Sequence, residues 1–391
     1  EFAIISIDID KFRLINDRYG VEIGNRSLMI LGKTIKKVAQ KNSIAKRYQG
    51  DVFSVLLSYK TDQDILNYMM TLSDRMHDND LLPTSISLVY GIYKVTDREV
   101  PIRLMCDRAR IAKKQIKGST LTNYAVYDDV IRLKMREQVE IEDEMEKALL
   151  NHEFVMYLQP QIWVEKRKIC SAEALVRWKH PIKGVLVPAQ FLQLFESNGF
   201  ITKLDTYMWE EACKYLADLQ KRKIDLPISV NISRVHIGNT DLPDILSGLV
   251  EKYKISPRLL ELEITENLFM DDVTELFDQM AELKKRGFKI LMDDFGSGYS
   301  SLNMLRKAPV DTLKIDRFFL DEILSTERGK IIVESSVRMA KLLGLLVVAE
   351  GVETKEQLDF LASVNCDIAQ GFYFSKPIPL AEFEVFLSKN I

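Results

Sequence analysis

The stretch between residues 260 and 350 holds four short apolar segments that end in charged side chains: Leu260-Glu-Leu-Glu-Ile-Thr-Glu266, Lys289-Ile-Leu-Met-Asp-Asp294, Thr312-Leu-Lys-Ile-Asp316 and Leu345-Leu-Val-Val-Ala-Glu350. Short apolar runs bounded by polar residues predict buried strands, and the segments between these runs have the spacing of amphipathic helices. Strands that alternate with helices in this way predict a parallel sheet covered by helices.

The same alternation extends over the chain after Asn151. The predicted strands are 154–159, 170–178, 228–231, 260–264, 289–293, 312–315, 345–349 and 368–374. Eight strands with helices between most of them, in about 250 residues, predict a (β/α)₈ barrel of the α/β class. An open doubly wound sheet is the alternative, but no G-x-G-x-x-G loop opens a helix here.

The first part of the chain mixes strands and helices without strict alternation, which predicts a smaller α+β or α/β sandwich. The predicted helices are 25–40, 62–78 and 102–116, and the predicted strands are 2–8, 43–57 (a pair) and 85–93. Residues 127–151 contain no Gly or Pro and predict a connecting helix. We therefore expect domains at 1–128 and 151–391, joined by a helix at 129–150. Because a buried strand starts at once, we also expect residues upstream, including a sensory or membrane region.

Bulk composition narrows the class of protein. The chain is 47% hydrophobic, and its net charge of −3 does not indicate binding to duplex nucleic acid. No apolar run reaches the length of a membrane span and no signal peptide is found, so a cytoplasmic protein is expected. Four cysteines without a CxxC pair and four histidines without metal spacing leave oxygen ligands, which favour Mg²⁺ or Mn²⁺.

Acidic and amide side chains gather in or just after the strands. They are Glu173, Asn231, Glu263, Glu266, Asp293, Asp294, Glu350, Glu353 and Gln370, with Lys314 and Asp316 beside them. The carboxyl ends of barrel strands meet at one mouth, where so many like charges repel one another unless cations are bound. One acid after a strand is usually a helix cap, but repetition after five strands predicts a site for two divalent cations.

The motifs around these residues form an ordered series. They are Tyr157-Leu-Gln159-Pro160, Glu173-Ala-Leu-Val-Arg177-Trp178, Val230-Asn231-Ile-Ser233, Glu261-Leu-Glu263-Ile-Thr-Glu266, Asp293-Asp-Phe-Gly-Ser-Gly-Tyr-Ser-Ser301, Lys314-Ile-Asp316, Val348-Ala-Glu350-Gly-Val-Glu353 and Gln370-Gly-Phe372. In this order, residues 140–391 resemble the EAL phosphodiesterases of bacterial cyclic di-GMP (c-di-GMP) signalling.

The resemblance implies a role for each matching residue. It assigns one metal to Glu173, Asn231, Glu263 and Asp293, and a second metal to Asp293, Asp294 and Glu350. It implies that Lys314, Glu350 and Glu353 serve catalysis, with water as the nucleophile and linear pGpG as the product. It also implies that Gln159, Arg177 and Gln370 hold the dinucleotide, that Glu266 anchors the glycine loop, and that the domain forms a homodimer.

The first domain resembles the GGDEF diguanylate cyclases with several positions changed. Asp8-Ile-Asp10-Lys-Phe12 and Ile15-Asn16-Asp17 match the family, and the signature hairpin reads Tyr48-Gln49-Gly50-Asp51-Val52-Phe53. Gln49 stands in place of a glycine, Val52 in place of an acid and Asn25 in place of an aspartate that reads guanine. Gln40 and Ser43 occupy the inhibitory-site positions. We expect no cyclase activity, although Asp8, Asp51 and Lys113 are compatible with binding GTP or a metal.

The resemblance favours an active c-di-GMP phosphodiesterase with a regulatory first domain. A catalytically weak c-di-GMP receptor that signals by a change of shape is the main alternative. A scaffold in which both domains serve only as partner surfaces is a third hypothesis.

Overall fold

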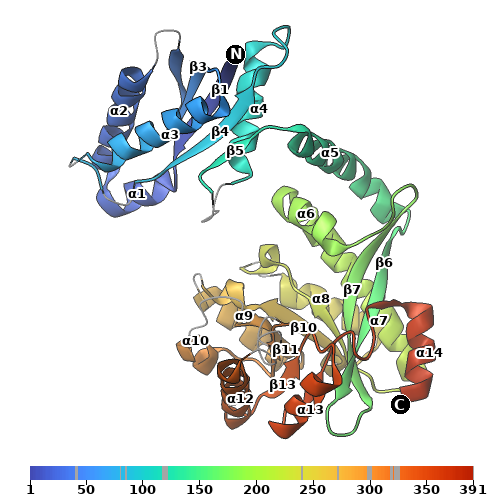
Figure 1. Cartoon of the computed structure of the whole chain (residues 1–391). Coiled ribbons are helices and arrows are strands. Elements are labelled where there is room, and N and C mark those ends of the chain that lie inside the picture. The colour runs from blue at the N-terminus through green and yellow to red at the C-terminus, as the bar shows by residue number, and fades with distance from the viewer. Residues whose placement is uncertain are drawn as a thin grey trace. The chain divides into compact units, whose positions relative to one another are not determined.

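The computed structural model describes residues 1–39, 43–79, 81–83, 86–116, 122–238, 241–270, 273–296, 302–317, 320 and 326–390. The chain divides into two compact units, Glu1–Val139 and Glu140–Ile391. The division falls inside the long helix α5 (Asp129–Leu150), so each unit includes part of this helix (Figure 1).

The first unit is a five-stranded sheet in the order β2-β3-β1-β4-β5. Its strands are β1 (Phe2–Ile9), β2 (Ile44–Gln49), β3 (Val52–Ser58), β4 (Leu88–Lys94) and β5 (Tyr124–Val126). Its helices are α1 (Phe12–Tyr19), α2 (Val21–Val38), α3 (Asp62–His77) and α4 (Ile102–Lys114). Residues of α1, α2 and α3 share one core with the sheet, while α4 packs on the opposite face. Alternate residues of the central β1 therefore enter two different cores.

Two elements of this unit were not predicted. Helix α1 is short and largely polar, and only Ile15 of its side chains is buried, so its apolar periodicity is weak. Strand β5 has three residues and pairs in parallel with β4, which is a long-range contact that local sequence does not encode.

The described residues of the second unit form ten strands. They are β6 (Phe154–Trp163), β7 (Ile169–His180), β8 (Gly184–Leu186), β9 (Ile228–Asn231), β10 (Leu260–Thr265), β11 (Lys289–Phe295), β12 (Thr312–Ile315), β13 (Leu346–Ala349), β14 (Ile368–Ala369) and β15 (Ile378–Pro379). The α-helices that the structure describes after α5 are α6 (Leu192–Asn198), α7 (Ile201–Lys221), α8 (Leu242–Tyr253), α9 (Val273–Lys285), α10 (Leu302–Lys307), α12 (Glu327–Leu342), α13 (Lys355–Ser363) and α14 (Leu380–Asn390).

Eight of these strands close into a barrel, which confirms the predicted fold class. The ring runs β6-β7-β9-β10-β11-β12-β13-β14, and β14 pairs back onto β6. Strands β7 and β9 to β14 are parallel, but β6 is antiparallel to both of its neighbours. The reason is the short connection from β6 to β7: residues 164–168 form a hairpin, and no crossover helix separates these strands.

The predicted last strand, 368–374, is wrong beyond residue 369. Strand β14 ends at Ala369, and the chain then turns, with Phe374 N donating to Gly371 O over 3.1 Å. A Cβ on Gly371 would lie 2.1 Å from Val352 O, so the turn packs directly on the backbone after β13. Gln370 therefore follows the strand instead of lying in it.

Candidate active site

One buried lysine is the centre of the barrel mouth. Lys314 in β12 is fully buried, and its Nζ contacts carboxylates from four other segments of the barrel. The distances are 2.8 Å to Glu263 Oε2, 3.0 Å to Asp293 Oδ1, 2.7 Å to Glu350 Oε1 and 3.5 Å to Glu173 Oε2. Burial opposes the charge of this lysine, but the surrounding carboxylates raise its pKa well above the usual value. The carboxylates around Lys314 thus favour its ammonium form at the centre of the cluster.

The carboxylates exceed what a single ammonium neutralises. Burial and the neighbouring Glu173 raise the pKa of Glu263 well above its usual value. Burial raises the pKa of Glu350 to about 8, although Lys314 acts in the opposite direction. Glu263 Oε1 is buried and has no hydrogen-bond partner among the described residues. An unpartnered carboxylate oxygen beside several others fits a bound divalent cation.

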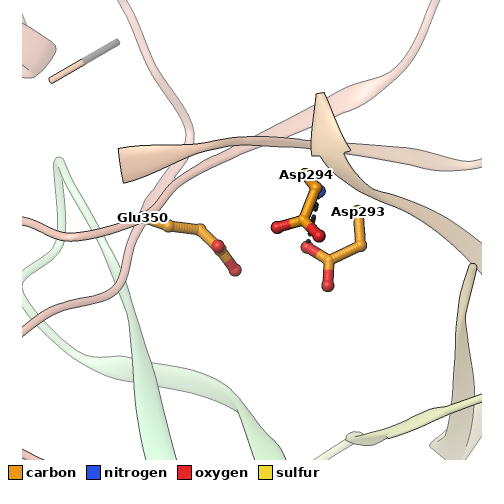
Figure 2. Close-up of side chains that lie close together, drawn as sticks. All are labelled: Asp293, Asp294 and Glu350. Atoms are coloured by element: carbon orange, nitrogen blue, oxygen red, sulfur yellow. Dashed lines mark hydrogen bonds between the residues drawn. The ribbon is translucent and has the colours of Figure 1, made fainter. Parts of the chain in front are cut away.

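A second, overlapping group of acids lies where β11 and β13 end (Figure 2). Ligand oxygens of Asp293, Asp294 and Glu350 lie within 4.8 Å of one another. Adjacent residues of a straight strand point to opposite faces, but the register of β11 shifts between Met292 and Phe295 and Asp294 has φ 57°. This irregularity turns both aspartates toward the mouth. Burial and the charge of Asp293 raise the pKa of Asp294 to about 6.

Asn231 and Glu266 flank the acids on two other strands. Asn231 ends β9 with an exposed side chain and, with Glu173, lines a cavity of about 500 Å³ at the mouth. Glu266 follows β10, and its Oε2 accepts a hydrogen bond from Gly296 N over 2.7 Å. The bond ties Glu266 to the start of the glycine loop, whose residues 297–301 lie outside the described part of the chain.

Four other predicted site residues have different surroundings. Gln159 and Gln370 are buried inside the barrel, where the amide of Gln370 donates to Glu173 Oε2 over 2.5 Å. Arg177 lies over the ring of Tyr157, 5.6 Å from its centroid, on the part of β7 beyond Glu173. Glu353 does not join the cluster: its side chain is 45% exposed and lies 3.7 Å from Arg317. The structure therefore gives no direct contact between Glu353 and Lys314 for the predicted support of Lys314.

Sequence reasoning missed the residues that hold the end of β9. Trp209 Nε1 donates to Asn231 O over 3.0 Å, and Asp205 Oδ2 accepts from Ser233 N over 3.3 Å and lies 3.1 Å from His236 Nε2. Asp205 is buried on the apolar face of α7. A charged residue at a core position of a helix was the available signal, because buried charges are rare without a partner.

The first unit gathers its own small polar group. Asp8 Oδ2 lies 3.0 Å from Lys113 Nζ, and Asp51 is close enough to influence the pKa of Asp8. Burial, then Asp51, raises the pKa of Asp8 to about 6 against the effect of Lys113. Asn16 lies under Gly24, where its Oδ1 is buried without a partner among the described residues.

The hairpin of the first unit is described only in part. Gly50 forms its turn with φ 59°, and Val52 begins β3. The side chain of Gln49 and the whole of Gln40 lie outside the described part of the chain.

None of the helices in the part of the chain that the structure describes is long and apolar enough to cross a bilayer.

An eight-stranded barrel whose mouth is lined with carboxylates is typical of enzymes that bind divalent cations through oxygen ligands. Comparison with known proteins identifies the family. The EAL domain model matches residues 142–377, and the model described as diguanylate cyclase, GGDEF domain matches residues 1–120. The chain therefore belongs to the EAL family and carries a GGDEF domain ahead of its EAL domain, as the sequence motifs predicted.

The chain is similar to named proteins with both domains. It is 33% identical over 391 residues, 98% of this chain and 50% of that protein, to "Cyclic di-GMP phosphodiesterase NbdA" of Pseudomonas aeruginosa. It is 30% identical over 384 residues, 97% of this chain and 56% of that protein, to "Bifunctional diguanylate cyclase/cyclic di-GMP phosphodiesterase MucR" of the same organism. The chain spans about half the length of the curated relatives it matches.

Solved structures agree with the fold. The "PaMucR Phosphodiesterase, c-di-GMP complex" is 33% identical with a TM-score of 0.60, covering 62% of this chain and 99% of that one. The Vibrio cholerae LapD S helix-GGDEF-EAL structure covers 95% of this chain and 88% of that one, with a TM-score of 0.62 and 19% identity. At that identity, the second comparison supports only the fold.

Proposed function

We propose that the EAL domain hydrolyses c-di-GMP to linear pGpG with two divalent cations, Mg²⁺ or Mn²⁺. The observation that carries the proposal is the excess of carboxylates around Lys314 at the barrel mouth. Similarity to a protein named a c-di-GMP phosphodiesterase supports the choice of substrate.

The proposed ligands divide into two sets that share one aspartate. The first set is Glu173, Asn231, Glu263 and Asp293, and the second set is Asp293, Asp294 and Glu350. The unpartnered Oε1 of Glu263 supports the first set. The close approach of Asp293, Asp294 and Glu350 supports the second (Figure 2).

The reaction transfers a phosphoryl group to water. The water oxygen forms a bond to phosphorus, the bond from phosphorus to the ribose 3′ oxygen breaks, and a water proton ends on that oxygen. Two ions at such a site lower the pKa of water and stabilise both oxygens of the displacement. The contacts of Lys314 Nζ with four carboxylates support a role in orienting the nucleophile and offsetting negative charge.

We propose substrate contacts on the strands that continue beyond the mouth. Arg177 offers a planar, bidentate group for a phosphate and already lies on the aromatic face of Tyr157. Contacts from Gln159 and Gln370 to the dinucleotide require release of amides that are bonded within the protein. Participation of Glu353 requires it to leave Arg317.

We propose that the GGDEF domain is regulatory and does not cyclise GTP. The substitutions at Gln49 and Val52 support this reading, and the group formed by Asp8, Asp51 and Lys113 supports binding of GTP or a metal. GTP that binds there is expected to change the phosphodiesterase rate.

We also propose that the EAL domain forms a homodimer. Ile331 and Ile332 are adjacent on α12 and are 59% and 46% exposed, which supports an apolar contact there. Sedimentation of the Ile331→Lys variant tests this contact, and an unchanged dimer fraction would exclude it.

Chromatographic assay of nucleotides tests the function directly. Purified chain is incubated with c-di-GMP and Mg²⁺, Mn²⁺ or EDTA, with and without GTP. Metal-dependent pGpG is expected, together with its loss in Glu173→Gln, which keeps the size of the side chain but removes its charge. Binding of c-di-GMP without turnover would instead establish the receptor alternative, and c-di-GMP made from GTP would refute the regulatory assignment.

A further inference from the structure

A chain of buried polar side chains crosses the barrel interior behind the carboxylates. Its members are Gln159, Gln161, Ser171, Glu173 and Gln370, each at most 8% exposed. Gln161 lies opposite Ser171 in the β6–β7 ladder, and Gln159 lies opposite Glu173 two residues further along. Side chains two residues apart on a strand point to the same face, so both pairs enter the barrel together.

Hydrogen bonds link the members in one direction. Ser171 Oγ donates to Gln161 Oε1 over 2.5 Å, and Gln161 Nε2 donates to Gln370 Oε1 over 2.7 Å. Gln370 Nε2 then donates to Glu173 Oε2 over 2.5 Å and to Gln159 Oε1 over 3.0 Å. The amides of Gln161 and Gln370 therefore both donate in the direction of Glu173 and Gln159.

Two acceptors determine the direction of this series of hydrogen bonds. Gln159 Nε2 donates to the backbone carbonyl of Ser375 over 3.2 Å, and a carbonyl only accepts. Gln159 Oε1 must then face Gln370 and receive its amino group. Glu173 Oε2 is the other acceptor, and it receives the second N–H of Gln370. Both acceptors require the amino group of Gln370 on the same side, which leaves its oxygen facing Gln161.

Reversal of the Gln370 amide would be costly. It would place Oε1 against the carboxylate of Glu173 and leave two acceptors facing each other in a buried site. Gln161 opposes this reversal because it donates to Gln370 Oε1, and Gln161 Oε1 is in turn occupied by the hydroxyl of Ser171. Gln161 and Ser171 thus complete the hydrogen bonds that keep the amino group of Gln370 on Glu173.

We propose that Gln161 and Ser171 are positioning residues that hold Glu173 ready to bind a divalent cation. The proposal rests on the proposed metal site of the EAL domain and adds two residues that none of the sequence motifs assigned. With Oε2 held by Gln370, Glu173 remains in the wall of the mouth cavity. Groups that orient a metal ligand typically change metal affinity by about 10- to 100-fold when they are removed.

Manganese binding in the absence of substrate tests the proposal. Mn²⁺ affinity of the whole chain is measured by electron paramagnetic resonance for wild type, Gln161→Leu and Ser171→Ala. Gln161→Leu should weaken binding about 10-fold or more. Ser171→Ala removes one hydrogen bond and should weaken binding about 2- to 10-fold. The side-chain amide resonance of Gln370 in metal-free, glutamine-labelled protein should shift in both variants.

Ser229→Ala is the matched control. Ser229 is fully buried in β9, opposite Glu173 in the β7–β9 ladder, and its Oγ has no hydrogen-bond partner within the described ranges. Its Mn²⁺ affinity should equal that of wild type. Unfolding temperatures in EDTA separate a folding defect from loss of positioning, because a purely structural role would lower stability and leave affinity unchanged.

The outcomes distinguish the two proposals. Wild-type Mn²⁺ affinity in Gln161→Leu, with a folded variant, would overturn the positioning role even if wild-type protein hydrolyses c-di-GMP. Wild-type protein that binds Mn²⁺ without hydrolysing c-di-GMP would overturn the proposed activity alone. An equal loss of affinity in Ser229→Ala would also overturn the positioning role, since any buried serine would then matter.

Discussion

Replacing Lys314 by Met should destabilise the metal-free EAL domain and make its stability depend on divalent cations. The variant keeps most of the side-chain volume but removes the ammonium that four carboxylates contact at 2.7–3.5 Å. Removing one partner of a buried ion pair costs about 3–5 kcal/mol. The unfolding temperature of a domain of 150–250 residues falls by about 2–4 °C for each kcal/mol lost, so that of Lys314→Met should fall by about 6–20 °C.

Scanning calorimetry in EDTA at pH 8 measures this effect, with Lys289→Met as the control. Lys289 lies 3.2 Å from Asp311 with a side chain that is 50% exposed, and such surface pairs contribute about 0–1 kcal/mol. Mn²⁺ should restore most of the stability of Lys314→Met by replacing the lost positive charge. Protonation of the acids should restore part of it at pH 6. A variant that unfolds within 2 °C of wild type in EDTA at pH 8 would refute the reasoning.

Three further predictions concern the groups around the cluster. Metal-free wild-type protein should lose stability in urea unfolding as the pH rises from 5 to 8. Burial raises the pKa of Glu350 to about 8 from an ordinary value of 4.5, which holds in the unfolded chain. The stabilisation from protonated Glu350 is therefore complete below pH 4.5 and is lost as the pH rises through 8. Stability that rises over this range would contradict the prediction. Glu266→Met should lower the free energy of unfolding by about 1–3 kcal/mol and slow turnover, because Gly296 N loses its acceptor. Glu266→Gln keeps an acceptor and should retain turnover. Equal turnover rates in the two variants would exclude the anchoring role of Glu266. Trp209→Phe should cost about 0.5–1.5 kcal/mol and weaken Mn²⁺ binding through Asn231, and unchanged affinity would show that the indole bond is only structural.

The sequence was sufficient to predict the eight strands of the barrel but not how each one meets its neighbours. Apolar runs located every strand of the barrel, and two of them, 228–231 and 312–315, match the observed bounds. The antiparallel direction of β6 could not be read from those runs, because periodicity is the same in both directions. Strand β14 was predicted too long, since the constraint at Gly371 comes from the distant Val352.

The candidate site shows the same limit at the level of single residues. Strand ends predicted that Glu263, Asp293 and Lys314 meet, and the structure brings them together. A regular strand does not predict that Asp294 joins Asp293 on one side, because that requires a shift of register. Residue spacing likewise gave no sign that Glu353 pairs with Arg317 instead of approaching Lys314, since loop conformation decides it.

Charge balance separates the two domains of this chain. In the GGDEF domain, Asp8 lies 3.0 Å from one lysine, Lys113, and the position after Asp51 is the uncharged Val52. Burial raises the pKa of Asp8 to about 6, so this acid binds a proton more readily than an exposed aspartate does. At the EAL mouth, four carboxylates lie 2.7–3.5 Å from the single ammonium of Lys314. Protonation there requires several buried acids to remain neutral at once, whereas a divalent cation satisfies them together. We therefore expect tight metal binding in the EAL domain and weak metal binding in the GGDEF domain, and the ratio of these affinities measures how unequal the two sites are.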